Sequence, residues 1–327
     1  MISNELRSRF GKAFREYVKT HRIAVENRDL LTASDVEGGA LISMQFNEQL
    51  NVATKVYGPI VSLVNYREVE KFQTVKTTQV DPTVNNFTVL TEGSTAASSL
   101  KQQPTMSSEV LSADTLLSSI VLSRQFVSDS EFDIFDWLVK NIAPGVARAK
   151  EGAILLGTDS HGSALGNSPS GGLIGATFGE TTTEASGDLA DGPTFALMSS
   201  LAASIDRSYW SEGSYLVSPN TEAWMREQVD STGRELYAVG DDGFLTVAGR
   251  KVYPGVGIPD YDTASSVIAL FGSWQRFWST VATSVRVKVV NESPTLNINE
   301  VELLVYFRIA NTPGVASAAA KLVSAAS

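Results

Sequence analysis

The chain has 327 residues, of which 43% are hydrophobic and 19% charged, so it can bury a sizeable core as one large domain or as two. Its formal net charge of -10 argues against a dedicated nucleic-acid reader, and its lack of cysteine excludes disulfides, thiolate metal sites and cysteine nucleophiles. Because no apolar run approaches the roughly 18 to 20 residues of a membrane span and the N-terminus shows no signal-peptide pattern, we expect neither a membrane segment nor export by that route.

The N-terminal segment differs in charge from the rest. Residues 1–30 carry seven Lys/Arg against four Asp/Glu, which makes them net +3 and the remainder net -13. Residues 3–20 place apolar side chains at helical spacing, with most basic ones off that stripe: Leu6, Phe10, Phe14 and Tyr17. We expect a short amphipathic helix that docks on its own body or on a neighbouring subunit; DNA or an acidic partner is the alternative. A polar, glycine-bearing joint follows at residues 34–39.

The stretch from Val61 to Leu122 is rich in Val, Thr, Ser and Phe, the composition of β-strands. Its clearest strands cover residues 72–80 and 86–90, and turn residues follow at Asp81-Pro82, Glu92-Gly93 and Pro104. This pattern favours a long two-stranded excursion over a compact core. Since an isolated ribbon of two strands is marginally stable in water, we expect this one to rest on another surface.

A long helix is predicted next. Ser128 and Glu131 have the spacing of a capping box, and apolar residues then recur every three or four positions from Phe135 to Leu156. Some 27 residues of helix would span about 40 Å. Because proline inside a helix costs about 3 kcal/mol, we predict a kink or two abutting helices near Pro144.

The remainder reads as a mixed α/β unit with no repeat of fixed period. Residues 157–192 are rich in Gly, Ser and Thr and are predicted to be loop. Beyond them we expect helices near 197–205 and 221–230, strands at 215–217, 267–271, 285–290 and 301–309, and a terminal helix at 316–323.

No chemical site is predicted. Asp159-Ser160-His161 holds the residue types of a hydrolase triad, but sequence neighbours cannot adopt the geometry of a triad. The two histidines, His21 and His161, do not have the i, i+4 spacing of a zinc-binding pair and are predicted to be solvated, and the glycine-rich residues 162–175 lack the lysine of a phosphate-binding loop. Asp241-Asp242-Gly243 is too short for a calcium loop and is predicted to be a turn. We therefore expect no catalytic, cofactor-binding or metal-binding residues.

Several short segments, taken in order, carry a family resemblance. They are residues 38–42 after the arm, 92–93 with Pro104 in the ribbon, 126–130 before the long helix, 149–158 and 171–174 around its end, and later 216–221, 230–234, 271–273 and 308–311. Over roughly residues 30 to 320 the sequence resembles the major capsid proteins of tailed bacteriophages with the Hong Kong 97 fold.

The resemblance implies an α+β protein built around a peripheral domain and an axial domain. The peripheral domain takes residues 46–66, 110–190 and 291–327, with a spine helix at about 131–157, and the axial α/β domain takes residues 191–290. An extended two-stranded loop at 67–109 and an N-terminal arm at 1–45 with its short basic helix complete the expected fold.

The same resemblance implies a structural function rather than an enzyme. The chain is expected to self-assemble into pentamers and hexamers of an icosahedral head that encloses double-stranded DNA without sequence preference. It would assemble in the bacterial host cytoplasm, reside in the virion, and have a scaffolding protein, a portal and a decoration protein as partners, with no cofactor and no membrane. The alternatives are an encapsulin-type compartment shell, a tail tube or sheath protein and, from another class, a hydrolase acting through residues 159–175.

Two departures from the family pattern lead to further expectations. Members often begin with a long, cleavable scaffolding segment, whereas only the short basic helix precedes the arm here, so we expect a separate scaffolding protein or a processed chain. Some members join subunits through a lysine–asparagine isopeptide bond, and Lys71, Lys76 and Lys101 lie in the presumed loop. A reactive lysine needs a buried carboxylate and an aligned partner, so we predict solvated lysines and a shell without crosslinks.

Overall fold

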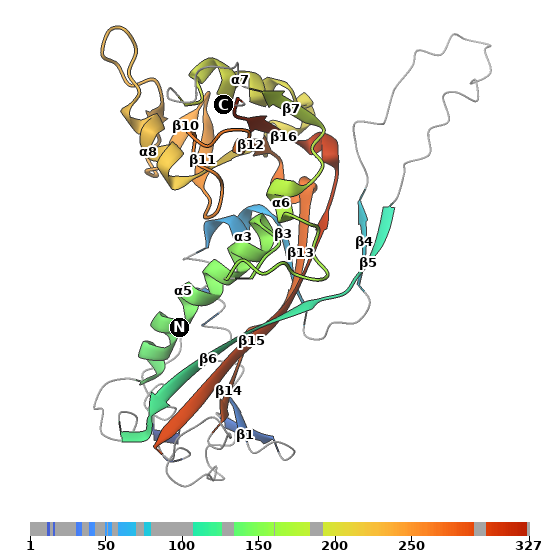
Figure 1. The fold of residues 1–327 in the computed structure, drawn as a ribbon, viewed down its shortest axis with the longest axis vertical. Helices are drawn as coiled ribbons and strands as arrows, with labels where there is room; N and C mark the ends of the chain where they lie inside the picture. Colours follow the sequence, from blue (N-terminus) through green and yellow to red (C-terminus); the bar gives the residue numbers. More distant parts are fainter. Residues whose placement is uncertain are drawn as a thin grey trace, which may run out of the picture.

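The computed structural model describes residues 12–13, 16, 31–34, 39–42, 50, 52–53, 58–69, 75–79, 107–125, 134–159, 161–183, 192–290 and 299–325. Over these residues the fold is α+β, with two seven-stranded sheets and a separate two-stranded ribbon (Figure 1). Each seven-stranded sheet has its own large cluster of buried apolar side chains. The molecule is therefore elongated, with one core at each end and helix α5 (Ile134–Leu155) reaching from one towards the other.

The first sheet is organised by its longest strand, β15 (Glu300–Pro313). Strand β6 (Asp114–Ser123) pairs antiparallel along one edge of β15, and β13 (Trp278–Thr283) and β14 (Arg286–Val290) pair along the other. The sheet is completed by β3 (Asn65–Val69) beside β13 and by β2 (Gly39–Ile42) and β1 (Leu31–Ser34) beyond β14. Alternate residues of β15, including Val301, Leu303 and Val305, are buried in the core that the sheet shares with α5.

Helix α5 covers one face of this sheet. Its buried stripe comprises Leu138, Ile142, Val146 and Ala153, which have the helical spacing that the sequence predicts. Pro144 and Gly145 lie on the exposed side, where water can satisfy the carbonyl that loses its partner to proline. Because the packed stripe spans the proline, α5 remains one helix, and the predicted alternative of two abutting helices is wrong.

The second sheet forms the core at the other end of the molecule. Its order is β7-β16-β12-β8-β11-β10-β9, with the bounds Glu180–Thr183 (β7), Ser214–Val217 (β8), Ala238–Val239 (β9), Leu245–Val247 (β10), Arg250–Pro254 (β11), Val267–Gly272 (β12) and Ala319–Val323 (β16). The central strands β8 and β12 are almost wholly buried, and the rings of Tyr215 and Phe271 lie 4.5 Å apart between them. This aromatic packing fixes the second core.

The helices α7 (Phe195–Ala203) and α8 (Pro219–Glu227) pack on the second sheet and form with it what we call the second unit, and both start at side-chain caps. Thr194 accepts from the amide of Leu197 at the start of α7, and Ser218 does so from Thr221 at the start of α8. Proline at the first position of α8 places its start two residues before the predicted one. Three shorter helices are α3 (Pro59–Leu63), α6 (Gly172–Gly175) and α9 (Trp274–Phe277), and Arg207–Tyr209 forms a 3-10 turn. No helix in that part is long and apolar enough to cross a membrane.

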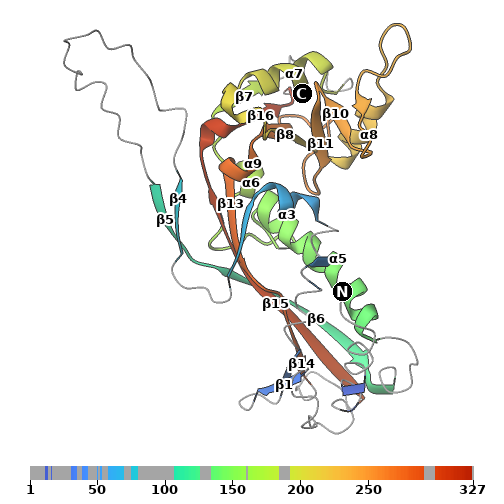
Figure 2. The same ribbon diagram turned by 180° about the vertical axis from the view of Figure 1, so that it is seen from behind.

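The ribbon consists of β4 (Val75–Gln79) and β5 (Ser107–Leu111), paired antiparallel from Val75↔Leu111 to Gln79↔Ser107. Figures 1 and 2 show these strands standing away from both large sheets, as expected for the predicted excursion. The predicted strand at 86–90 and the turns at 81–82, 92–93 and 104 lie outside the described residues.

The last predicted helix is wrong. Residues 316–318 form a short 3-10 turn, and Ala319–Val323 forms strand β16 between β12 and β7. Alanine favours helix locally, but here each strand neighbour supplies backbone partners and buries Ala319, Ala320 and Leu322. The predicted loop at 157–192 also contains structure, namely α6 and β7.

Strand pairing crosses the predicted domain boundaries. Strands β13 and β14 fall within the predicted axial segment 191–290, yet they pair in the first sheet with β15. Conversely, β7 and β16 fall within the predicted peripheral segments 110–190 and 291–327 but pair in the second sheet. The chain therefore passes between the two cores several times, because strands that are distant in the sequence complete each sheet.

Only part of the N-terminal arm can be compared with its prediction. Lys12, Ala13 and Glu16 are helical, and Ala13 is buried in the first core with Leu50, Leu122 and Leu138. At this point the predicted helix docks on its own chain. The other residues of that helix, most of the joint at 34–39 and the capping box at 128–131 lie outside the described part.

Candidate assembly surfaces

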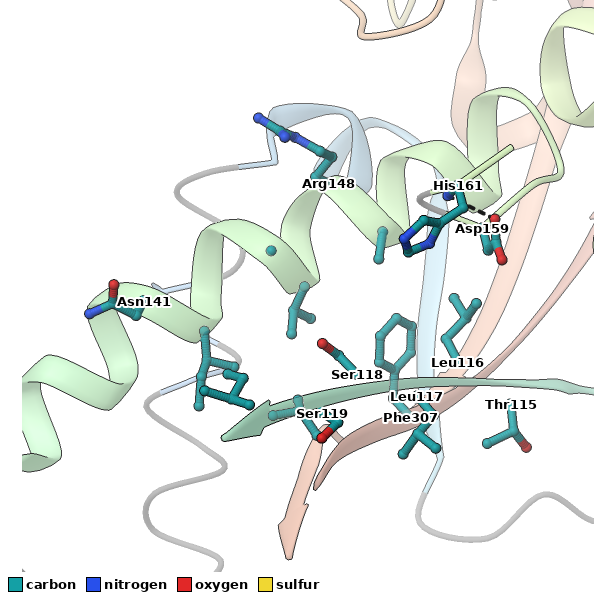
Figure 3. A pocket seen from close by; sticks show the side chains of 16 residues that line it. Thr115, Leu116, Leu117, Ser118, Ser119, Asn141, Arg148, Asp159, His161 and Phe307 are labelled. Carbon is teal, nitrogen blue, oxygen red and sulfur yellow. Dashed lines mark hydrogen bonds between the residues drawn. The ribbon is translucent and has the colours of Figure 1, made fainter. Parts of the chain in front are cut away.

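A groove runs between helix α5 and strand β6 in the first sheet. Its volume is about 700 Å³, and it is lined by apolar side chains, including Leu116, Ile120, Val146 and Phe307, together with polar ones. Figure 3 shows Asn141 and Arg148 on the helical side of the groove and His161 near one end. A concave surface with this mixture of apolar and polar side chains is suited to contact with another molecule.

The two faces of β6 differ in burial. Even-numbered residues such as Leu116 and Leu122 point towards α5 and pack on the first core, whereas odd-numbered residues point away from it (Figure 3). Of these, Leu117 is 64% exposed and Val121 is 52% exposed. Two large apolar side chains on one exposed strand face mark a surface suited to contact with another protein.

A hydrogen-bonded clamp fixes the base of the ribbon where β5 turns into β6. The amide N–H of Asn167 donates to Asp114 Oδ2 at 2.9 Å, and its side-chain Nδ2 donates to Asp114 Oδ1 at 2.8 Å. Ser112 Oγ donates to Asn167 Oδ1 at 2.6 Å. The loop after α5 therefore helps to set the direction in which the ribbon leaves the body.

Two glycines allow the chain to cross itself at the end of α5. Gly157 and Gly172 adopt φ values of +64° and +57°, and a Cβ added to Gly172 would lie 2.3 Å from the backbone nitrogen of Gly157. Both segments belong to the family-like stretches of the sequence. Their glycines are required by this close backbone approach, and no bound group is needed to explain them.

Helix α5 also buries two charged residues, Lys150 and Glu151. Lys150 Nζ lies 5.3 Å from the centroid of the Tyr66 ring and 5.6 Å from that of Phe307, an arrangement that favours a cation. Glu151 Oε1 accepts from the Ile60 amide at 3.4 Å, and burial raises the pKa of this carboxyl above its usual value. Because Lys150 is only 3% exposed, it is not available to join another subunit.

The predicted hydrolase-like residues do not form a catalytic arrangement. Asp159 Oδ1 accepts from the amides of His161 at 2.8 Å and Ser163 at 2.9 Å, and these bonds, that from Ser163 first, lower the pKa of Asp159. The carboxylate thus stabilises a turn, and Ser160 lies outside the described residues. The described residues contain no cluster of three His, Asp or Glu that could hold a metal ion.

The other residues that the sequence analysis considered are the turn at 241–243, the three lysines of the presumed loop and His21. Asp241-Asp242-Gly243 is a turn as predicted, with Asp242 ion-paired to Lys251. Lys76 lies in β4, whereas Lys71, Lys101 and His21 lie outside the described residues.

A second exposed apolar surface lies on the second unit. A cavity of about 300 Å³ is lined by Phe195, Trp224, Leu236 and Tyr237, among others. Tyr237 Oη donates to the Pro193 carbonyl at 3.1 Å, and burial raises the pKa of Tyr237 to about 12. Near it in sequence, Val229 is 54% exposed and Val239 is 48% exposed. This surface is a second candidate for contact between subunits.

Sequence reasoning identified neither the groove nor the exposed β6 face. A signal was nevertheless present, since Leu116, Leu117, Ile120, Val121 and Leu122 put apolar side chains on both faces of one strand. Such a strand is expected to be covered on both sides, whereas the described residues cover this one on one side only.

Comparisons with known proteins agree with one another. A family model described as the phage capsid family matches residues 38–324. Among solved structures, the capsid of an empty GTA particle computed with C5 symmetry is 18% identical with a TM-score of 0.62, over 83% of this chain and 90% of that one. A structure from Gordonia phage Cozz is 15% identical with a TM-score of 0.55, over 82% of this chain and 86% of that one. The capsid structure of the cyanophage P-SCSP1u is 11% identical with a TM-score of 0.52, over 81% of this chain and 87% of that one. No curated protein matches the sequence.

Proposed function

Because the chain belongs to the phage capsid family, we propose that it builds the icosahedral head of a tailed phage, as pentamers and hexamers that enclose double-stranded DNA. The family is structural rather than enzymatic, and the chain is a major capsid protein and a virion component with the Hong Kong 97-like fold. The alternatives, an encapsulin-type shell and a tail tube or sheath protein, receive no support from the comparisons.

One observation carries the proposal: the family match over residues 38–324 covers α5, the ribbon, the second sheet and every strand of the first sheet except β1. In this proposal the first sheet and α5 form the peripheral domain, with α5 as its spine helix, and the second sheet forms the axial domain at the centre of each capsomer. The ribbon reaches a neighbouring subunit. The groove and the exposed faces of β6 and of the second unit supply surfaces that many copies can cover.

The proposal extends to partners. A scaffolding protein assists assembly in the host cytoplasm, a portal occupies one vertex, and a decoration protein can bind outside. The body of the chain is acidic, with net charge -13 beyond residue 30, so DNA is enclosed rather than gripped by sequence-reading contacts.

The nature of the particle content tests this function. Particles from infected or induced cells are purified, treated with nuclease, and analysed for protected DNA and for co-purified protein. We expect long, nuclease-protected double-stranded DNA. Particles that hold a folded enzyme and no DNA would contradict the proposal and favour the compartment shell.

A further inference from the structure

Charge is distributed unevenly over the described surfaces of this acidic chain. Residues 192–272, which hold most of the second unit, carry ten Asp/Glu against five Lys/Arg. The face of the first sheet opposite α5 carries both signs, for example Glu302 of β15 and Lys288 of β14. Helix α5 differs from both, because from Trp137 to Lys150 it carries three bases and no acid. Positive charge therefore gathers along this helix.

Two of these three bases, Lys140 and Arg148, are exposed. They are eight residues apart, which corresponds to about 12 Å along the helix axis. Figure 3 shows Arg148 extending away from strand β6. The exposed residues between the two bases lie with them within about 140° of the helix circumference. We call this side of α5 the basic strip, and its five exposed residues are Lys140, Asn141, Pro144, Gly145 and Arg148.

The middle of the basic strip is low and uncharged. A Cβ added to Gly145 would have nothing within 4 Å, and Pro144 beside it has only a short ring. Asn141 Nδ2 donates to the Trp137 carbonyl at 2.8 Å, and the same nitrogen carries a second N–H that can serve a partner. A large, stiff partner can thus approach the helix between the two bases, and the amide adds a hydrogen-bond donor.

The next two acids along the chain, Glu151 and Asp159, turn their carboxyl groups away from this side. Glu151 is 6% exposed, and its Oε1 accepts from the Ile60 amide. Asp159 shares the groove with Arg148, but its Oδ1 accepts from the amides of His161 and Ser163 within its own turn. Neither Lys140 nor Arg148 forms an ion pair with another described residue. The charge of the strip is therefore available to a partner.

The N-terminal arm brings further positive charge to the same unit. Residues 1–30 are net +3. Within them Lys12 is exposed, whereas its neighbour Ala13 is buried in the first core together with Leu138 of α5. The arm is thus anchored at the core that α5 covers. Two basic segments, distant in the sequence, belong to one end of the molecule.

We propose that the basic strip of α5 contacts the phosphate backbone of the enclosed double-stranded DNA, so that this side of the first sheet faces the interior of the shell. The inference rests on the proposed shell function and names the surface that meets the DNA. Phosphate contacts position DNA without reading its sequence, which agrees with an acidic chain that is no sequence reader. Duplex DNA carries a charge every ~1.7 Å of its axis, so two bases about 12 Å apart meet different phosphates. Each subunit contributes little, but many copies line the shell.

Cleavage by a tethered reagent tests which face meets the DNA. The chain has no cysteine, so one introduced cysteine can carry an iron–EDTA group that cuts nearby DNA. Gly145→Cys places the group at the centre of the strip, and Leu117→Cys, 64% exposed on the opposite face, is the control. Purified DNA-filled particles are labelled and activated with ascorbate, and wild-type particles give the background. We expect strand breaks well above background from Gly145→Cys and background levels from Leu117→Cys.

Equal cleavage by the two variants, or more from Leu117→Cys, would overturn the inference and leave the shell function intact. Asn141→Cys takes the place of Gly145→Cys if that variant yields no particles. Wild-type particles that hold no DNA would instead overturn the proposed function.

Salt dependence tests the two bases directly. Binding of a short fluorescent DNA duplex to dispersed subunits is measured between about 50 and 200 mM salt. Losing two phosphate contacts should lower the slope of log K against log salt by about 1.8 in the double variant Lys140→Gln, Arg148→Gln. The control Arg207→Gln, Arg234→Gln removes two exposed bases from the second unit and should leave the slope unchanged. Equal reductions would show that net charge alone matters and would contradict the strip.

Two further arms separate charge from structure and DNA from protein. The exchanged pair Lys140→Arg, Arg148→Lys keeps both charges and should keep the wild-type slope; a slope as low as that of the glutamine variant would contradict phosphate contact. Poly-glutamate of equal total charge should displace the duplex poorly, because an extended polypeptide has about half the charge density of duplex DNA. Displacement as effective as that by unlabelled duplex would assign the strip to an acidic protein and overturn the inference.

Discussion

The side-chain amide of Asn311 donates to the carbonyl oxygen of Ala153 at 2.8 Å and so joins β15 to the last turn of α5. The same Nδ2 donates to Ser168 Oγ at 3.1 Å, and Asn311 Oδ1 accepts from Thr280 Oγ1 at 2.8 Å. Asn311 is 2% exposed, so water cannot replace these bonds. One side chain therefore holds together the helix end, the following loop and two strands of the first sheet.

Replacing Asn311 with alanine should destabilise the subunit. The change leaves the Ala153 carbonyl and the Thr280 hydroxyl buried without this partner, and we expect a loss of about 2 to 4 kcal/mol in the free energy of unfolding. Urea unfolding of dispersed subunits measures it. The exposed Asn299→Ala is the control and should change stability by less than about 0.5 kcal/mol. Equal losses would contradict the assigned role.

The close backbone approach of Gly157 and Gly172 predicts that an added methyl group destabilises the subunit more at this crossing than at an exposed glycine. Gly172→Ala combines a positive φ with a Cβ 2.3 Å from the Gly157 nitrogen, so we expect a loss above about 3 kcal/mol or failure to fold. Gly233→Ala also has a positive φ, +80°, but nothing lies within 4 Å of its Cβ, and it should cost about 1 kcal/mol. Soluble yield and thermal unfolding report both, and similar behaviour of the two variants would show that the close approach is unimportant.

Buried Glu151 predicts a pH dependence of stability. Because burial raises its pKa in the folded subunit, the folded chain holds this proton more tightly than the unfolded chain does. The tighter proton binding therefore stabilises the folded subunit. This stabilisation is complete at pH values below 4.5, the usual pKa of a glutamate, and is lost as pH rises through the raised pKa of Glu151. Glu151→Gln should therefore be the more stable chain at neutral pH, and its advantage should shrink as pH falls towards 4.5. Urea unfolding of both chains between pH 4.5 and neutral pH measures this difference in stability. A difference that does not vary with pH would show that the raised pKa of Glu151 is not its cause.

The shell is predicted to lack covalent crosslinks. Lys150 is buried against two rings, and the amide of Asn311 is occupied by the Ala153 carbonyl and Ser168, so neither residue is available for an isopeptide bond. Mature particles should give a single monomer band on a denaturing gel. A ladder of covalent oligomers would contradict this and would direct attention to Lys71, Lys76 and Lys101.

The sequence predicted those elements whose pattern is local. Helix α5 carries a clear apolar period and strand β12 is a continuous apolar run, and the structure places both close to the predicted bounds. Strand β16 was missed because its alanines favour helix until β12 and β7 flank it. The pairing of β13 and β14 with β15 could not be predicted either, because sheet membership depends on partners that are distant in the sequence. The apolar residues of β6 marked a strand that needs cover, but the groove beneath α5 could not be predicted from them, because its walls come from β6, α5 and β15 together.

The most direct test of the central claim is negative-stain electron microscopy of the purified chain after assembly, alone or with its phage lysate. Closed spherical shells of uniform size are the predicted result, since a capsid subunit joins its copies through many repeated contacts that close on themselves. Open tubes would indicate a tail protein, and monomers that stay dispersed under every assembly condition would contradict the account.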